Sequence, residues 1–511
     1  MRWLTNLVDK IVATQPEGDI LIESGASPSG TYHMGHLREI LTCDAVLLEL
    51  RRRGREARHV HFSDDLDALR KIPVNIPAEF EQYLGKPLCD VPAPDGSDRS
   101  YGDFFLAGFT ESAKTLGIEM EVIRSHEKYR AGYFVPAIER VLSRLPEARR
   151  ALETISGREL DEFWSPIQVM EDGYLKNRTF VDIDTESKTI IYQDREGNQN
   201  NTNYDAGQVK LDWRLDWPGR WWLMKIGVEP FGRDHASAGG SFDTGKQIMR
   251  DIYEAPAPIP VPYDFINRAG DTKKMSASKG TGIATEDAVR VLPPEVLRYF
   301  ILSAPPEKRL YFDPVDGVVK LIDEFAELLA KPDKSEEDEL LLYICRGSIG
   351  ERVVVSTVPF SHLVESYQAA LKNPEVTLRI ISRSEHGDAS EKNQEIIKEE
   401  LKFIDAWLEN WAPEEVKFTL QDSVDAGGFR DAEVLFFQGL ADKIAAAPAD
   451  ADGEWFHKAI YDFKETSGMQ PKELFTSLYR LLIGKDSGPR AGWFLSSLPR
   501  DWLVARLRLE S

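Results

Sequence analysis

The sequence predicts an α/β fold with a Rossmann-type parallel sheet, followed by a mainly helical region. Residues 19–25 are typical of a buried strand, the loop 26–30 follows, and a helical pattern then continues to Leu50. Residues 58–63 have the pattern of the next strand, so the chain begins with a βαβ unit. Ligands of such units bind where the strands end.

Further along the chain this alternation is interrupted and then resumes. A helical pattern and then an alternating, strand-like pattern predict an inserted α+β region, and strands return near Trp222. From Pro293 onward, apolar residues at three-and-four spacing predict helices. The expected parts are a first catalytic half (1–92), an insertion (93–212) and a second catalytic half (213–292). A connecting helical region (293–335) and an all-α region (336–511) are expected to follow.

Composition narrows the class of protein. A chain of 511 residues is too long for one core, so several domains are expected. The formal charge of −22 argues against a protein that coats nucleic acid through a global positive field. The start of the chain lacks a signal-peptide stretch, and no apolar run approaches the roughly 20 residues that span a bilayer. A cytoplasmic protein with no membrane contact is expected.

The first loop carries groups suited to binding phosphate. His33-Met34-Gly35-His36 stands at the start of the helix after the first strand. Helix N-termini present free N–H groups to phosphate, glycine permits close approach, and imidazoles can donate to phosphoryl oxygens. Taken alone, such a pair of histidines is more often a helix-capping feature than a catalytic one.

A second motif gives the histidines a chemical context. Lys273-Lys274-Met275-Ser276-Ala277-Ser278-Lys279-Gly280 resembles the Lys-Met-Ser-Lys-Ser loop of class I aminoacyl-tRNA synthetases, with Ala277 where a second lysine is usual. The resemblance implies that His33, His36, Lys274 and Lys279 stabilise the charge that develops when a carboxylate attacks the α-phosphate of ATP. The ATP-binding residues it implies are Gly30, His33, Gly35, His36, Gly232, Asp234, Lys274, Met275, Ser276, Ser278 and Lys279.

Within this class the chain resembles the lysyl enzymes. Synthetases for glutamate carry an arginine where this chain has Glu23, and the inverted charge favours a cationic amino acid. The segments 213–218 and 231–240 also resemble lysyl enzymes. The resemblance implies lysine-binding roles for Glu23, Gly25, Ser27, Trp213, His235 and Tyr263. Two alternatives remain open: Glu23 as a partner of neighbouring backbone, and the two aromatic residues as plain core.

The expected function is therefore ATP-dependent lysine activation and transfer to the terminal adenosine of tRNA(Lys). Lysine, ATP as its Mg²⁺ complex and tRNA are the expected partners of a monomer, and residues 336–511 are expected to form an α-helical anticodon-binding domain. No zinc is expected, because the Cys-x-x-Cys pairs of many relatives are missing after Pro166. The alternatives are a glutamyl-type synthetase, a non-catalytic tRNA-binding paralogue and a small-molecule nucleotidyltransferase.

Overall fold

The computed structural model describes residues 1–510 except 158, 162–163, 271–281, 350–353 and 449–450. The chain divides into two compact units, which are described separately. Unit 1 contains residues 1–290, 294–312 and 334–352, and unit 2 contains residues 291–293, 313–333 and 353–511.

Unit 1 is built on a parallel sheet, which confirms the predicted fold class. Among the described residues this sheet has five strands in the order β11-β10-β1-β2-β3, all parallel. The chain first forms one half of the sheet and then returns to pair β10 with β1 in its centre, which creates a topological switch point between these two strands. The strands are β1 (Ile20–Ala26), β2 (Ala57–Ser63), β3 (Glu121–Arg124), β10 (Val228–Gly232) and β11 (Ile259–Tyr263).

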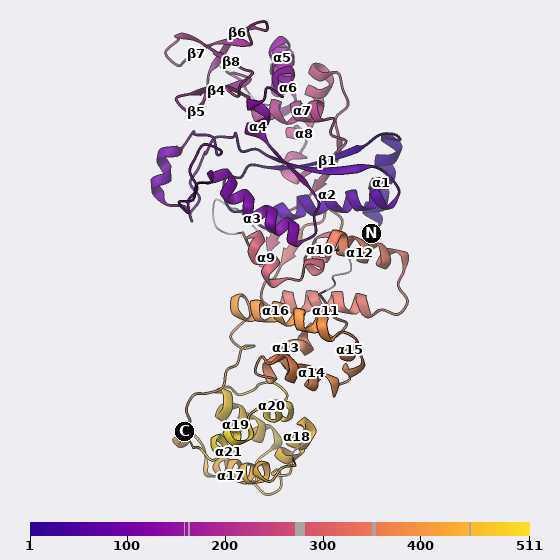
Figure 1. The fold of residues 1–511 in the computed structure, drawn as a ribbon, viewed down its shortest axis with the longest axis vertical. Coiled ribbons are helices and arrows are strands. Elements are labelled where there is room, and N and C mark those ends of the chain that lie inside the picture. Colours follow the sequence, from indigo (N-terminus) through magenta and orange to yellow (C-terminus); the bar gives the residue numbers. More distant parts are fainter. Residues whose placement is uncertain (158, 162–163, 271–281, 350–353, 449–450, 511) are drawn as a thin grey trace. The chain divides into compact units, whose positions relative to one another are not determined.

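The strand sequences fit a sheet covered on both faces. β1 begins Ile-Leu-Ile and is buried over its first five residues, and β10 is buried throughout. The helix α2 (Met34–Arg52) packs on β1, β2 and β10, and α1 (Arg2–Thr14) packs on α2 (Figure 1). The third strand lies within the range expected for the insertion, because α3 (Tyr101–Thr115) and β3 form a second crossover after a long irregular segment.

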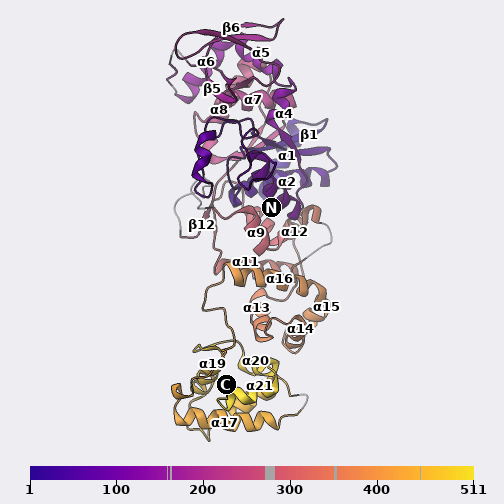
Figure 2. The same ribbon diagram turned by 60° about the vertical axis from the view of Figure 1, so that its left-hand side comes forward.

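The insertion thus follows β3 rather than residue 92. It contains three helices and two antiparallel sheets, with strand orders β5-β4-β9 and β6-β7-β8 (Figures 1 and 2). Helix α7 (Trp213–Met224) then leads back to the central sheet. The inserted elements are α4 (Ser125–Arg130), α5 (Val135–Ser143), α6 (Leu145–Ser156), β4 (Ile167–Glu171), β5 (Tyr174–Asn177), β6 (Thr179–Asp184), β7 (Thr189–Gln193), β8 (Gln199–Asn203) and β9 (Val209–Leu211).

A buried arginine joins some of the remaining elements of unit 1 to α2 and α3. Arg298 makes an ion pair of 2.5 Å with Asp44 of α2, and both side chains are fully buried. The same guanidinium donates to the carbonyl oxygens of Leu116 and Ile344, so it joins three helices and the end of α3. The remaining helices and strands of unit 1 are α8 (Ser241–Ile248), β12 (Ile266–Arg268), α9 (Thr285–Val291), α10 (Pro294–Leu302), β13 (Leu310–Phe312) and α12 (Glu336–Arg346).

The regular secondary structure of unit 2 is helical in its described residues, as the three-and-four spacing predicts. Its helices bury leucine, isoleucine and phenylalanine side chains in a common core. In the part of the chain that the structure describes, no helix of either unit is long and apolar enough to cross a membrane. The helices of unit 2 are α11 (Gly317–Ala330), α13 (Phe360–Ala369), α14 (Pro374–Ser382), α15 (Gly387–Lys392), α16 (Gln394–Asn410), α17 (Asp431–Ala445), α18 (Gly453–Tyr461), α19 (Pro471–Ile483), α20 (Ala491–Ser497) and α21 (Arg500–Leu507).

Candidate active site

A cavity of about 350 Å³ lies in unit 1 where the parallel strands end. Its walls include residues that end or directly follow β1, β2, β10 and β11, on both sides of the switch point. The cavity is lined by Gly25, Ala26, Ser27, His33, Gly35, His36, Glu39, Asp64, Asp67, Trp213, Trp217, Arg220, Glu229, Pro230, Phe231, Gly232, Asp234, His235, Tyr263 and Phe265.

Two histidines form the start of α2 at one wall of this cavity. His33 is the N-cap residue, and its Nδ1 accepts a hydrogen bond of 3.1 Å from the backbone N–H of Gly35. His36 Nδ1 accepts a hydrogen bond of 3.1 Å from the backbone N–H of His33. Burial lowers the pKa of His36 well below its usual value. A neutral ring that accepts at Nδ1 carries its proton on Nε2, so His36 offers an N–H donor for a phosphoryl oxygen.

The backbone around His33 is closely packed. An alanine Cβ at Gly35 would lie 2.8 Å from the Cε1 atom of His33, so only glycine leaves room for this ring. The N–H of Met34 donates to the carbonyl of Ile283, and the N–H of Thr285 donates to the carbonyl of Tyr32. Thus the residues that follow segment 271–281 pair with the start of α2. Lys274, Met275, Ser276, Ser278 and Lys279 lie in that segment, outside the described residues.

Glu39 supplies an oriented carboxylate to the cavity. Its Oε1 accepts from the backbone N–H of Gly25 at 2.8 Å, and its Oε2 accepts from the hydroxyl of Tyr263 at 2.5 Å. Burial raises the pKa of Glu39 to about 7, against the lowering effect of these two hydrogen bonds. A carboxylate has about four acceptor positions, so two bonds fix the group and leave capacity for a cationic ligand.

A buried arginine joins two further carboxylates beside the cavity. Arg220 Nε lies 2.8 Å from Glu23 Oε1, and its Nη1 donates to both Asp64 oxygens at 3.1 and 3.2 Å. Burial raises the pKa of Glu23, with Arg220 opposing this effect. Burial likewise raises the pKa of Asp64, to about 6. Glu23 is fully buried and is not among the residues that line the cavity, but its ion pair with Arg220 connects it to the lining.

Aromatic rings form another wall. Trp213 stacks on Trp217 with ring centroids 5.2 Å apart, and the ring of His235 lies 5.3 Å from that of Trp213. The indole N–H of Trp217 donates to Glu229 at 2.7 Å, which holds another buried carboxylate at the cavity. An aliphatic stem with a terminal cation fits between such rings and carboxylates.

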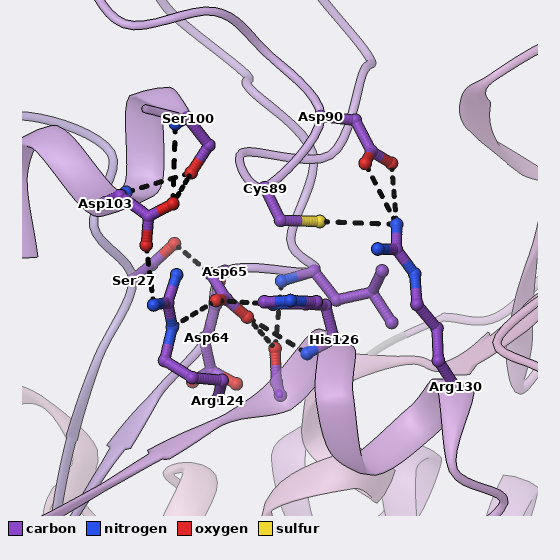
Figure 3. Close-up of polar contacts among 12 residues, drawn as sticks. Ser27, Asp64, Asp65, Cys89, Asp90, Ser100, Asp103, Arg124, His126 and Arg130 are labelled. Atoms are coloured by element: carbon purple, nitrogen blue, oxygen red, sulfur yellow. Dashed lines mark hydrogen bonds and ion pairs between the residues drawn. The ribbon is translucent and has the colours of Figure 1, made fainter. Parts of the chain in front are cut away.

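The loop after β2 is fixed by Asp65, whose side chain is fully buried (Figure 3). It accepts hydrogen bonds from Arg124 Nε at 2.6 Å, from the Ser125 hydroxyl at 3.0 Å, and from the backbone N–H and Nδ1 of His126. Burial acts to raise the pKa of Asp65, but these hydrogen bonds and the nearby charges lower it overall. This network holds the chain next to Asp64, whose carbonyl accepts from the Ser27 hydroxyl.

The structure brings most of the predicted site residues together at the cavity. Those that line it are Gly25, Ser27, His33, Gly35, His36, Trp213, Gly232, Asp234, His235 and Tyr263, whereas Glu23 and Gly30 do not. Sequence reasoning did not select Glu39, Asp64, Trp217, Arg220 or Glu229. The spacing of Glu39, three residues after His36 on one helix face, is a signal that could have found it.

Comparison with known proteins shows the family of the chain. Residues 1–344 match the family described as tRNA synthetases class I (K). The chain is 34% identical to Lysine--tRNA ligase 1 of Methanosarcina acetivorans, over 100% of this chain and 98% of that protein. It is 36% identical to the lysine--tRNA ligase of Archaeoglobus fulgidus, over 95% of this chain and 96% of that protein. The chain therefore belongs to the family of class I tRNA synthetases of the lysine type.

Proposed function

We propose that this protein is a lysine–tRNA ligase, which activates L-lysine with ATP and transfers it to the 3′-terminal adenosine of tRNA(Lys). One observation carries the proposal: the cavity at the switch point combines an imidazole N–H donor at a helix start with a carboxylate-rich, aromatic-walled pocket. The names of the similar archaeal proteins support the same activity.

The charges around the cavity favour a cationic amino acid. Five carboxylates line it, and Arg220 is the one arginine or lysine among the described lining residues. That guanidinium already faces Glu23 and Asp64, so it is not available for the carboxylate of a glutamate side chain. Of the carboxylates, we assign Glu39 to the ε-ammonium group, because the hydrogen bonds from Gly25 and Tyr263 hold it in one orientation.

The other roles follow from position. We assign Gly25 and Ser27, at the end of β1, to the amino-acid end of lysine, and Trp213 and His235 to its aliphatic stem. Glu23 acts as a positioning residue, because it holds Arg220 against Asp64. This role differs from the direct contact with lysine that its inverted charge predicts.

The activation step depends on stabilising the charge that develops around phosphorus, more than on covalent catalysis by the protein. A lysine carboxylate oxygen attacks the α-phosphorus of ATP, lysyl-adenylate forms, and the bond to pyrophosphate breaks. We assign His33 and His36, with Gly35, Gly232 and Asp234, to binding of the nucleotide. Mg²⁺ is proposed to enter with ATP, bound mainly by phosphate oxygens and water. A hydroxyl of the terminal adenosine then attacks the carbonyl of the adenylate, and AMP leaves.

The test is ATP–pyrophosphate exchange with lysine, glutamate and arginine in turn, each with and without tRNA. Exchange with lysine alone among these amino acids is the expected result. Exchange driven by glutamate would favour the glutamyl-type alternative, and no exchange with any amino acid would favour the tRNA-binding paralogue. Light scattering of the purified chain tests the further proposal that it acts as a monomer.

A further inference from the structure

A buried lysine of the insertion reaches the charged groups around the unit 1 cavity. Lys210 lies in β9, the last strand of the insertion, and only 1% of its side chain is exposed. Its Nζ lies 3.1 Å from Oδ1 of Asp67 and 3.2 Å from Oδ2 of Asp216. Asp67 lines the cavity, and Asp216 belongs to α7, which carries other lining residues. One ammonium group thus joins the insertion to two walls of the site.

The surroundings of Lys210 hold its ammonium group in one place. Tyr129 of α4 donates to the same Asp216 oxygen at 2.6 Å, and the backbone N–H of Leu211 donates to the Tyr129 hydroxyl at 3.3 Å. The ammonium group also lies 5.7 Å from the centre of the Tyr129 ring. Strand β9 pairs with β4, with Leu211 opposite Ile167. A lysine enclosed in this way cannot turn to solvent, so its charge stays between the two carboxylates.

The local balance of charge depends on this cation. Burial acts to lower the pKa of Lys210, but Asp216, Asp67 and Asp64 raise it overall, so the ammonium group stays charged. Burial raises the pKa of Asp64 to about 6, and Arg220 and Lys210 oppose this rise. Buried carboxylates that lose their cation tend to take up protons. Here two cations, Lys210 and Arg220, face four carboxylates: Glu23, Asp64, Asp67 and Asp216.

We propose that Lys210 is a positioning residue for lysine activation, because it holds the Asp67 carboxylate in place at the cavity. The inference rests on the proposed function, in which a negatively charged cavity binds a cationic amino acid. Lys210 is not among the residues that line the cavity, so it acts through Asp67 and not by contact with the substrate. The insertion thus contributes a group to the amino-acid site.

Calorimetric titration of the full chain with lysine measures the effect on affinity. Lys210→Met is expected to weaken lysine binding about 10-fold at pH 7. Removal of a nearby cation raises the pKa of a carboxyl group, and a protonated carboxyl group does not attract an ammonium group. The loss of affinity should therefore shrink as the pH is raised to 8.5. Lys210→Arg keeps the charge and should restore most of the affinity.

A double-mutant cycle tests whether Lys210 acts through Asp67. Asp67→Asn and Lys210→Met should each weaken lysine binding about 10-fold, and the double variant should bind no more weakly than either, because both changes remove the same interaction. A loss of about 100-fold in the double variant would show that the two residues act independently. That result would overturn the inference, as would wild-type affinity in Lys210→Met.

A second lysine of the insertion provides the matched control. Lys188 lies 2.6 Å from an oxygen of Glu139 and 6.0 Å from the centre of the Tyr204 ring. The Tyr204 hydroxyl donates to the same Glu139 oxygen, so the three groups have the same chemistry as Lys210, Asp216 and Tyr129. They are not among the residues that line the cavity, and Lys188→Met should leave the lysine affinity unchanged.

Circular dichroism shows whether Lys210→Met folds. If it does not, Lys210→Met/Asp216→Asn takes its place, because this variant leaves only Asp67 without its cation. The same loss of lysine affinity is expected, and wild-type affinity in this variant would overturn the inference.

Pyrophosphate exchange separates this inference from the proposed function. In Lys210→Met, KM for lysine should rise as the affinity falls, and kcat should change much less. A wild-type protein that binds lysine but shows no lysine-dependent exchange would reject the proposed function, and the titrations would still test the role of Lys210.

Discussion

Removing the negative charge of Glu39 should weaken lysine binding strongly. In Glu39→Gln the amide oxygen can still accept from the Gly25 N–H, and the amide NH2 can donate to the Tyr263 oxygen in place of the present bond, but the charge that faces the ammonium group is lost. Loss of one partner from a desolvated charge pair costs about 2–4 kcal/mol, which corresponds to a roughly 30- to 700-fold rise in KM for lysine. The same pair of Glu39 and the ε-ammonium group holds lysine in the ground state and in the transition state. Therefore kcat should change much less than KM.

The pH dependence gives a second test of the same residue. Burial raises the pKa of Glu39 to about 7, and an ammonium ligand favours the ionised form, so lysine binding should release a proton near neutral pH. The affinity for lysine should therefore be full above about pH 7 and fall as pH is lowered through 7. Lysine keeps its ε-ammonium charge throughout this range, because its pKa is about 10.4.

Steady-state exchange kinetics between pH 6 and 8.5, with lysine varied at saturating ATP, measure both effects. The wild-type protein should lose kcat/KM for lysine toward pH 6, and Glu39→Gln should show a lower and flatter profile over the same range. Tyr263→Phe is the matched control, because it removes one hydrogen bond to Glu39 and keeps the charge. A lysine KM for Glu39→Gln within threefold of wild type would refute the assignment of Glu39 to the ammonium group.

Three other substitutions test separate parts of the structure. Gly35→Ala should displace the His33 ring and lower kcat by on the order of 100-fold with little change in lysine affinity, as single-turnover and binding measurements would show. Arg298→Met should lower the free energy of unfolding in urea by about 3–5 kcal/mol, because Asp44 is left buried without its partner; an unchanged midpoint would contradict this. Glu23→Gln should raise KM for lysine by about 10-fold through loss of its ion pair, and wild-type exchange would exclude its positioning role.

The central sheet could be predicted from sequence because its signals are local. The buried strand at residues 20–26 and the histidine pair that follows it stand together in one short stretch. The partners of Arg220 could not be predicted in the same way. They depend on the pairing of β1 with β2 and β10, for example Ile22 with Val228, and nothing in the nearby sequence encodes that register.

The boundary predicted at residue 92 leaves β3 outside the first half of the sheet, although β3 pairs with β2. The irregular segment between β2 and α3 hides the helix-and-strand pattern that continues the sheet, so β3 was assigned to the insertion. The position of Glu23 is prominent in the sequence, but sequence alone does not reveal that a buried arginine faces it. Local patterns thus predict elements and motifs, whereas ion pairs between distant segments require the fold.

The pairing of β10 with β1 has a consequence for synthesis of the protein on the ribosome. About 200 residues separate the two strands, and at roughly 5–20 residues per second their translation takes about 10–40 s. Throughout that interval one edge of an apolar strand has no partner, which is the condition that promotes association with other chains. Nascent chains stalled before Val228 should therefore depend on chaperones, and slow codons in the insertion should reduce the yield of folded protein.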